Sequence, residues 1–226
     1  GGGGQNHMRH GWDPRDLSQK ITQVLEYRPP FNEDVQQDYF NTIQDLFGAR
    51  KKMIAFEDIE NHPQELYIRD FYVSGCIQGY DNGRLFKPDQ VINRAEFVKV
   101  VLCTRNKNIR FPSQNPFPDV QKDAWFAPFV AKAKELQWIQ GYGDGYFRPA
   151  QSISRAEALK VVLEAFDENI NAQARSSYSD VPNYAWYSPY IAKAETLGIL
   201  TETRSFRPDV KATRAQVVEW LVKMQK

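Results

Sequence analysis

Three arginines stand at equivalent places in the chain, and each could bind an anion. They occur in Asn93-Arg94-Ala95-Glu96, Ser154-Arg155-Ala156-Glu157 and Thr213-Arg214-Ala215-Gln216. Asn, Ser and Thr are favoured helix N-caps, and Glu or Gln three residues later completes a capping box. Each arginine is therefore expected in the first turn of a helix. A cation there opposes the helix dipole, at a cost of a few tenths to about 1 kcal/mol.

The capping box does not explain why the chain accepts this cost three times. Free backbone N–H groups and a guanidinium at the start of a helix would together suit a carboxylate ligand. We therefore favour ligand binding by the three arginines. A purely structural salt bridge, for instance to the repeated Asp58, Asp119 or Asp180, stays open as the alternative.

Two tryptophans and two glycine-rich loops accompany the arginines. Trp125 and Trp186 occupy matching places, each shortly before a proline that suits the first helical position. An aromatic ring beside an anion site can hold a sugar through apolar contact, or it can pack against the protein, and the sequence leaves both open. Gly79 lies in one loop, and Gly141 and Tyr142 lie in the other. Glycine there would let the backbone approach a ligand.

Other kinds of functional site are not indicated by the sequence. It has no nucleophile elbow, no His-Glu-x-x-His and no phosphate-binding loop. The repeated acids occupy helix-cap positions, so no pair is singled out for glycoside cleavage. The loops with Asp81-Asn82-Gly83 and Asp144-Gly145 lack the spaced carboxylates of a calcium loop and are predicted to be turns. We expect no catalytic residue, no cofactor and no metal site.

Composition narrows the choice of partner and compartment. The 226 residues include 29 Lys or Arg and 28 Asp or Glu, a near-balance that argues against a nucleic-acid binder. The apolar stretches are only a few residues long, so no membrane insertion is expected, and no leader is visible. The protein is either cytosolic or has lost a signal peptide. Two cysteines, Cys76 and Cys103, are too few for a disulfide framework. They are expected to be small, partly buried side chains, with a single disulfide between them as the alternative.

The elements that position these residues recur with a period of about sixty residues. Phe56-Glu57-Asp58-Ile59 returns as Phe117-Pro118-Asp119-Val120 and as Tyr178-Ser179-Asp180-Val181. Each copy reads as a helix, a turn-rich loop and a second helix. The second helices carry an apolar stripe in every copy: Ala95, Val98, Val101 and Leu102; Ala156, Leu159, Val162 and Leu163; Ala215, Val218, Leu221 and Val222. A short helix cannot bury such a stripe alone, so the three should share a core, around a pseudo-threefold axis or in a linear stack.

The repeats also divide the chain. We assign residues 1–11 to a linker-like tail, 12–53 to a helical lead-in segment, 54–110 to copy one, 111–170 to copy two and 171–226 to copy three. Two apolar stripes predict the lead-in helices, namely Leu17, Ile21, Val24 and Leu25, and then Val35, Tyr39, Ile43, Leu46 and Phe47. Copy one lacks the tryptophan and copy three lacks the glycine loop. We therefore expect unequal sites, fewer than three of them good.

Three ordered copies of these motifs resemble S-layer homology domains. The resemblance implies an all-α unit of three helix–loop–helix repeats in a pseudo-threefold arrangement. It also implies non-covalent anchoring at a bacterial cell surface, by binding a secondary cell-wall polysaccharide, often pyruvylated, in grooves between repeats. The alternative is a protein-interaction or lattice module, with partner binding or self-association through residues 12–53. In either case the protein is expected to be extracellular.

Overall fold

A computed structural model describes residues 19–20, 22–23, 37–39, 41–46 and 56–226. The chain divides into two compact units, Gly1–Glu57 and Asp58–Lys226. In the lead-in segment the described residues are all helical, as expected, and they include Tyr39, Ile43 and Leu46 of the second stripe. The other residues of the two lead-in stripes, and the tail, lie outside the described residues.

The second unit contains six helices. They are α4 (Glu65–Tyr72), α5 (Arg94–Thr104), α6 (Ala127–Glu135), α7 (Arg155–Ala165), α8 (Ser188–Leu197) and α9 (Arg214–Met224). Residues 58–226 form only isolated β-bridges and no strand, so this unit is all-α as predicted. Within the described residues no helix is both long and apolar enough to cross a membrane.

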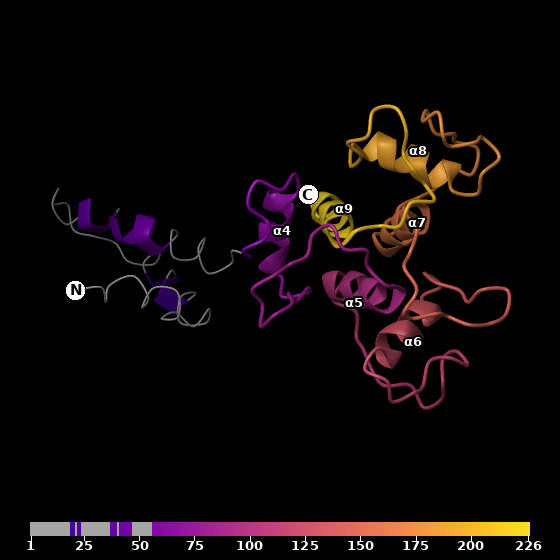
Figure 1. Cartoon of the computed structure of the whole chain (residues 1–226), viewed down its shortest axis with the longest axis horizontal. Coiled ribbons are helices and arrows are strands. Elements are labelled where there is room, and N and C mark those ends of the chain that lie inside the picture. The colour runs from indigo at the N-terminus through magenta and orange to yellow at the C-terminus, as the bar shows by residue number, and fades with distance from the viewer. Residues whose placement is uncertain (1–18, 21, 24–36, 40, 47–55) are drawn as a thin grey trace. The chain divides into compact units, whose positions relative to one another are not determined.

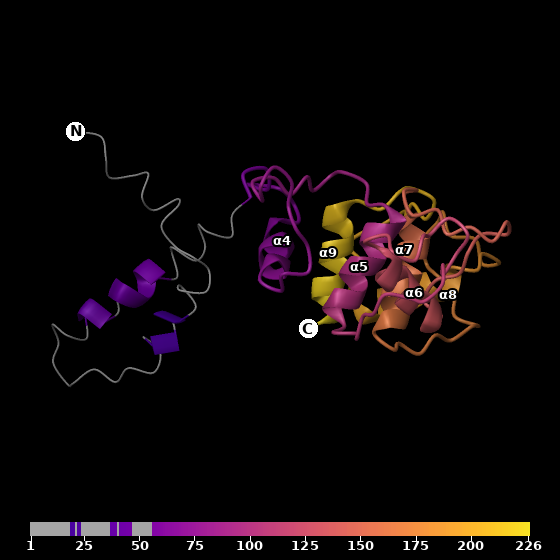
Figure 2. The same cartoon turned by 90° about the horizontal axis from the view of Figure 1, so that it is seen from below.

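The second helices of the three copies, α5, α7 and α9, meet at the centre (Figure 1), and Figure 2 shows them side by side. Asn93, Ser154 and Thr213 cap them, because each side chain accepts a hydrogen bond from the backbone N–H three residues on. Every residue of the predicted stripes is buried. Further apolar side chains, such as Phe97 and Trp220, are buried outside the stripes, so these helices are enclosed on more than one face.

A closed ring of backbone hydrogen bonds lies just ahead of the central helices. The N–H of Ile92 donates to the carbonyl oxygen of Ala212, that of Ala212 donates to Ile153, and that of Ile153 donates to Ile92. The donor–acceptor distances are 3.1, 2.9 and 3.4 Å. Because one residue of each copy donates once and accepts once, the copies are related by a pseudo-threefold axis. The linear stack is excluded.

The first helix of each copy packs on the second helix of the preceding copy. Thus α6 lies against α5, α8 lies against α7, and α4 closes the ring against α9 (Figure 1). Their buried side chains include Val130 and Ala133 of α6, and Ile191 and Ala194 of α8. Each interface between neighbouring copies therefore contains the first helix of one copy and the second helix of the copy before it.

The expectation for the two cysteines was wrong. Cys76 and Cys103 form a disulfide, with their Cα atoms 5.5 Å apart. The bond ties the loop after α4 to the last turn of α5, across a sequence separation of 27 residues. A single bridge requires only that two cysteines meet in the fold, so a small cysteine count excludes a disulfide framework without excluding this bond.

Candidate functional site

The three arginines are buried and link neighbouring copies. Arg94, Arg155 and Arg214 are 2%, 4% and 0% exposed. Each donates a hydrogen bond from Nε to the carbonyl oxygen of a phenylalanine in the following copy: Arg94 to Phe147 at 2.8 Å, Arg155 to Phe206 at 3.0 Å and Arg214 to Phe86 at 2.9 Å. The same guanidinium groups lie over the phenylalanine rings. Each arginine therefore has a structural role, whatever else it binds.

The expectation of free backbone N–H groups beside each arginine was wrong. In α5 the N–H of Arg94 donates to Gln151 at 2.9 Å, and that of Ala95 donates to Pro149 at 3.0 Å. The third N–H, that of Glu96, donates to the capping side chain of Asn93 at 2.8 Å. Helices α7 and α9 repeat this arrangement. Of the groups expected to bind an anion, only the guanidinium is therefore not excluded by these backbone hydrogen bonds.

The fourth residue of the capping box also serves a neighbouring copy. Glu157 pairs with Nη1 of Arg94, Gln216 accepts from Nη1 of Arg155, and Glu96 pairs with Nη1 of Arg214. Only the N-cap half of the predicted box is therefore formed.

The repeated aspartates are not the partners of the arginines. Asp119 accepts hydrogen bonds from the N–H groups of Phe147 and Arg148, at 2.9 and 2.8 Å. Asp58 and Asp180 do the same in their own copies. The salt bridge held open from the sequence is thus replaced by the bonds to Glu157, Gln216 and Glu96.

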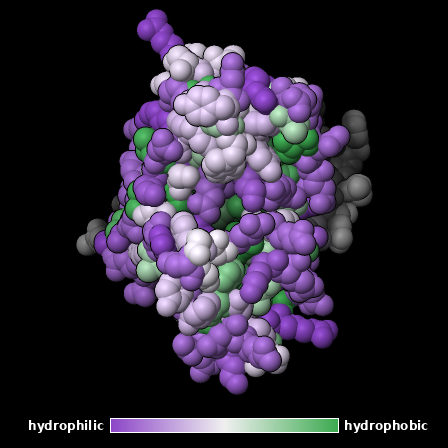
Figure 3. Space-filling model, turned by 90° about the vertical axis from the view of Figure 1, so that its right-hand side faces the viewer, coloured by the Kyte–Doolittle hydropathy of each residue, from purple (hydrophilic) through white to green (hydrophobic). Residues whose placement is uncertain are grey.

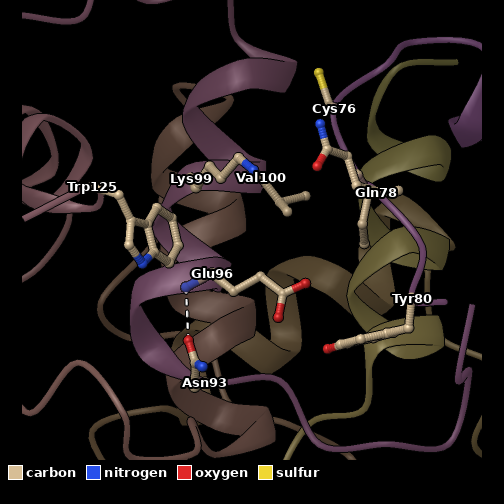
Figure 4. Close-up of a pocket in the computed structure, with 9 residues that line it drawn as sticks. Cys76, Gln78, Tyr80, Asn93, Glu96, Lys99, Val100 and Trp125 are labelled. Atoms are coloured by element: carbon tan, nitrogen blue, oxygen red, sulfur yellow. Dashed lines mark hydrogen bonds between the residues drawn. The ribbon is translucent and has the colours of Figure 1, made fainter. Parts of the chain in front are cut away.

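A pocket of about 200 Å³ lies between copies one and two (Figure 4). Copy one supplies Cys76, Ile77, Gln78, Tyr80, Asn93, Glu96, Lys99 and Val100, and copy two supplies Trp125. Figure 4 shows Trp125 on one side and the segment from Cys76 to Tyr80 on the other. Arg214 of copy three does not line the pocket, but it contacts three residues that do: it bonds Gln78 and Glu96 and stacks on Tyr80 at 4.8 Å. We call this pocket, with Arg214, the first site.

Equivalent residues define two more sites. In the second site Arg94 contacts Glu157 and Tyr142, and the repeat places Lys160 and Trp186 as the equivalents of Lys99 and Trp125. Its Arg94 stacks on Tyr142 at 4.8 Å, as Arg214 stacks on Tyr80. Figure 3 views the side on which copies two and three meet, which is mostly hydrophilic and indented between two lobes. The third site consists of Arg155, Glu202, Gln216 and Glu219, with Pro63 at the place of the tryptophans and Gln64 beside it, bonded to Glu219.

The guanidinium groups differ in what their Nη2 atoms contact. Nη2 of Arg214 donates to the carbonyl oxygen of Gln78 at 2.9 Å, and Nη2 of Arg155 pairs with the carboxylate of Glu202. Among the described residues none accepts a hydrogen bond from Nη2 of Arg94. Burial lowers the pKa of Arg155 and of Arg214 from the ordinary value, and the charge of Glu202 partly offsets this effect at Arg155. The second site thus keeps a donor available.

Both predicted tryptophans are exposed at these sites. Trp125 is 56% exposed and Trp186 is 55% exposed. Each also makes edge contacts with its own helix, Trp125 with Phe126 and Trp186 with Tyr187. Packing thus fixes the ring while a large part of it faces solvent. Packing against the protein is therefore shown, and contact with a sugar stays a prediction for the exposed part of each side chain.

Gly141 has a structural reason to be glycine. A Cβ there would meet the ring of Phe117 at 3.0 Å and two backbone oxygens of its own loop at 3.2 Å. Close packing within the loop therefore accounts for this glycine, and the sequence argument from ligand approach is not needed for it. Gly79 lies between Gln78 and Tyr80 of the first site.

Sequence reasoning missed Tyr80, Lys99, Lys160 and Glu202. Lys99 lies 5.7 Å from the ring centre of Trp125, and Lys160 pairs with Glu164 at 3.4 Å. Both lysines stand five residues after an arginine of the repeated motif, a regularity that could have identified them. Tyr80 follows Gly79 as Tyr142 follows Gly141, which was also a usable signal.

Comparison with known proteins agrees with the three-copy architecture. The family model of the S-layer homology domain matches residues 55–98, 116–159 and 177–218. Cell surface glycoprotein 1 of Acetivibrio thermocellus is 35% identical over 62% of this chain, and the match covers 6% of that protein. Middle cell wall protein of Brevibacillus brevis is 29% identical over 70% of this chain, covering 14% of its own length.

A third relative is the cellulosome-anchoring protein of Acetivibrio thermocellus, 31% identical over 63% of this chain. The match covers 33% of that protein, so the chain spans a third or less of each of these three relatives. The family model covers more than half of the chain, in the three places where the repeats were found. The chain therefore belongs to the S-layer homology domain family.

Proposed function

We propose that this chain holds a surface protein on a bacterial cell wall by binding an anionic secondary cell-wall polysaccharide. Its family and the names of its relatives, which include a cell wall protein and an anchoring protein, support wall attachment in general. The arrangement of the first and second sites supports the finer statement about the ligand. The proposed role is binding without catalysis.

The observation that carries the proposal is the second site. Arg94 is 2% exposed and pairs with Glu157 through Nη1, while no described residue accepts a hydrogen bond from its Nη2. Trp186, at the place equivalent to Trp125 of the first site, is 55% exposed. A guanidinium suits a carboxylate, and an aromatic face suits the apolar C–H face of a sugar ring. A carboxylated sugar, such as a pyruvate ketal, carries both features.

The pocket of the first site limits the size of the occupant. Its volume of about 200 Å³ is below the roughly 300–1,000 Å³ of clefts that enclose drug-sized ligands. A small unit of a polymer fits such a pocket while the remainder stays outside. Several weak contacts along one polymer then add up through effective concentration, which suits an anchor that must hold without a covalent bond.

The disulfide supports a location outside the cytoplasm. Cys76 and Cys103 are the only cysteines of the chain, and they are paired. Disulfides persist in oxidising compartments and are rare in the reducing cytosol. Of the two compartments that the sequence left open, the extracellular one is therefore favoured.

The test is co-sedimentation with purified sacculi, before and after mild acid removal of secondary polymers and their ketals. Substitution of a motif arginine would also remove structural hydrogen bonds, so exposed residues make better probes. Trp186→Ala and Lys160→Ala alter the second site, and Trp125→Ala alters the first. Phe111→Ala is the matched control, because Phe111 is a 64% exposed aromatic residue that does not line the pocket. Thermal melting confirms that each variant is folded.

We expect binding to intact sacculi, loss of binding after acid treatment, and weaker binding of the tryptophan variants than of Phe111→Ala. Binding that survives removal of the polymers would overturn the polysaccharide ligand. A folded protein that does not sediment with sacculi would overturn wall anchoring. It would favour the alternative of a protein partner, with residues 12–53 as the next segment to test.

A further inference from the structure

We infer that Glu202 is a built-in occupant of the third site, so that this site does not take the anionic ligand of the first and second sites. The inference rests on the proposed function. It concerns which of the three repeated sites can bind a ligand. It identifies Glu202 as a residue that determines how many ligand units each chain binds.

The position of Glu202 is the first argument. In the loops before the repeated phenylalanines, Tyr80 and Tyr142 stack on the arginines of the first and second sites. Glu202 stands at the same place in copy three, and its carboxylate pairs with Nη2 of Arg155. The side chains of Arg155 and Glu202 are 5% and 12% exposed. A carboxylate of the protein therefore already lies on the guanidinium edge that a ligand carboxylate would need.

Glu202 is also held in place from its other side. Its second carboxylate oxygen accepts a hydrogen bond from the N–H of Thr201 at 3.2 Å, and its backbone carbonyl accepts from the hydroxyl of Tyr178 at 2.8 Å. A partly buried, charge-assisted pair fixed in this way is not displaced at low cost, because its members would be left without partners.

A second departure adds another carboxylate. Lys99 and Lys160 stand five residues after the arginines of α5 and α7, but α9 has Glu219 at this place. Glu219 is 4% exposed and bonds Gln216, Gln64 and Lys223. A ligand anion at the third site would therefore find a carboxylate already paired with Lys223, where the other two sites offer the positive charge of a lysine.

A third departure is the loss of the tryptophan that is proposed to contact the sugar. In copy one the residue that matches Trp125 and Trp186 is Pro63, next to Gln64 of the third site. Because first helices pack on the preceding copy, the missing tryptophan of copy one and the missing glycine loop of copy three fall in the same site. Three separate sequence changes thus gather where copy three meets copy one. The first and second sites keep the tryptophan, the lysine and the tyrosine.

Arg155 is retained for a structural reason. Its Nε bonds the carbonyl oxygen of Phe206 at 3.0 Å, and its Nη1 bonds Gln216 at 2.6 Å. These bonds join copies two and three as the other arginines join their neighbours. With the linking role preserved and the Nη2 edge filled by Glu202, the third copy completes the fold without adding a ligand site.

Reciprocal exchange of one residue tests this inference on the full chain. Glu202→Tyr gives the third site the residue of the other two, Glu202→Gln removes the charge at nearly constant size, and Tyr142→Glu gives the second site the residue of the third. The probe is the 4,6-pyruvate ketal of a methyl hexoside, with the neutral ethylidene acetal as control. Arginine Nε–Hε signals in NMR spectra report each site separately, and calorimetry gives the number of bound probes.

In the wild type, we expect the ketal to shift the signals of Arg94 and Arg214 and to leave that of Arg155 unchanged. Glu202→Tyr should bring Arg155 into the response, more weakly than Arg94 because Glu219 and Pro63 remain, and should raise the stoichiometry above two. Glu202→Gln should give a weaker gain at the same signal. Tyr142→Glu should weaken binding at Arg94 by about tenfold or more while leaving Arg214 unaffected.

The failures are distinguishable. A wild-type Arg155 signal that responds like that of Arg94, or a folded Glu202→Tyr protein in which only Arg94 and Arg214 respond, overturns the role of Glu202 alone. The titration is repeated with polymer released from sacculi. A response to this polymer but not to the ketal shows that the sites bind a different sugar. No response to either probe, together with no sedimentation with sacculi, overturns the proposed function and this inference with it.

Discussion

Nε of Arg94 lies 2.8 Å from the carbonyl oxygen of Phe147, although 53 residues separate them in the chain. The guanidinium also lies over the ring of Phe147, 4.7 Å from its centre. One residue of copy one thereby fixes both the backbone and the side chain of the loop in copy two. Because Arg214 makes the same contacts to Phe86 of copy one, the three arginines close the ring of copies.

We predict that Arg94→Leu destabilises the protein by about 2–4 kcal/mol, because it leaves the carbonyl of Phe147 and the carboxylate of Glu157 without a partner. The figure is below that of a fully buried ion pair, since the side chain of Glu157 is 29% exposed. Urea denaturation followed by circular dichroism measures it. Arg110→Leu, at an exposed arginine after α5, should change stability by less than about 0.5 kcal/mol. Equal effects of the two substitutions would contradict the linking role.

The starts and buried stripes of the central helices could be predicted because they depend on local chemistry. Asn93, Ser154 and Thr213 act within three residues, and an apolar stripe follows from helical spacing alone. The packing of α4 on α9 could not be predicted. The first helices of the three copies all bury apolar side chains, and nothing in their sequences says which copy covers them. Only the folded ring, with its shared backbone hydrogen bonds, distinguishes the partners.

The sequence identified candidate residues whose ligand contacts stay a prediction, and it gave only part of their arrangement. The repeated arginine indicated a side chain that pairs with an anion. The sequence could not show that Phe147 and Glu157 of another copy already accept hydrogen bonds from Arg94. The disulfide gave no repeat signal, because Trp138 and Glu164 stand at the matching places in copy two. Non-local contacts set both outcomes.

The disulfide gives the second prediction. Reduction should lower the free energy of unfolding by about 2–4 kcal/mol, because the bond closes a segment with a sequence separation of 27 residues and so restricts the unfolded chain. Thermal and urea melts with and without a phosphine reductant measure the loss. The double variant Cys76→Ser/Cys103→Ser should melt like the reduced protein and show no response to reductant. A wild type insensitive to reduction would contradict the prediction.

The N-caps give a third prediction, which tests the equivalence of the copies. Asn93→Ala, Ser154→Ala and Thr213→Ala should each cost about 0.5–2 kcal/mol, because each removes the acceptor for one N–H in a first helical turn. Replacement of Ser154 by Asn or Thr, the residues of the other copies, should cost less than replacement by alanine. If only one of the three alanine variants were destabilised, the caps would not be equivalent.

Asp119 gives a fourth prediction. Its carboxylate accepts the N–H groups of Phe147 and Arg148, and Arg148 has a backbone φ of 62°, which is unusual for a residue with a side chain. Asp119→Ala should therefore destabilise the protein by about 2–4 kcal/mol, and Asp119→Asn by less, since an amide still accepts one bond. The control is Asp123→Ala, at an exposed aspartate of the same loop, with an expected change below about 0.5 kcal/mol. Denaturant melts of the three variants decide between these values.

The closed ring gives the last prediction. The C-terminal Lys226 lies beside α4, with Nζ 3.8 Å from Asp70, so the end of copy three is close to copy one (Figure 1). A circular permutant that begins at residue 111, ends at residue 110 and joins residue 226 to residue 54 by a Gly/Ser linker of about ten residues should fold, because every interface between copies is preserved. Its melt should be cooperative and its disulfide formed. A permutant cut between Leu159 and Lys160 is the control, since it opens central helix α7 and should lose the cooperative transition. If both permutants melted without cooperativity, the ring of copies could not be the unit of stability.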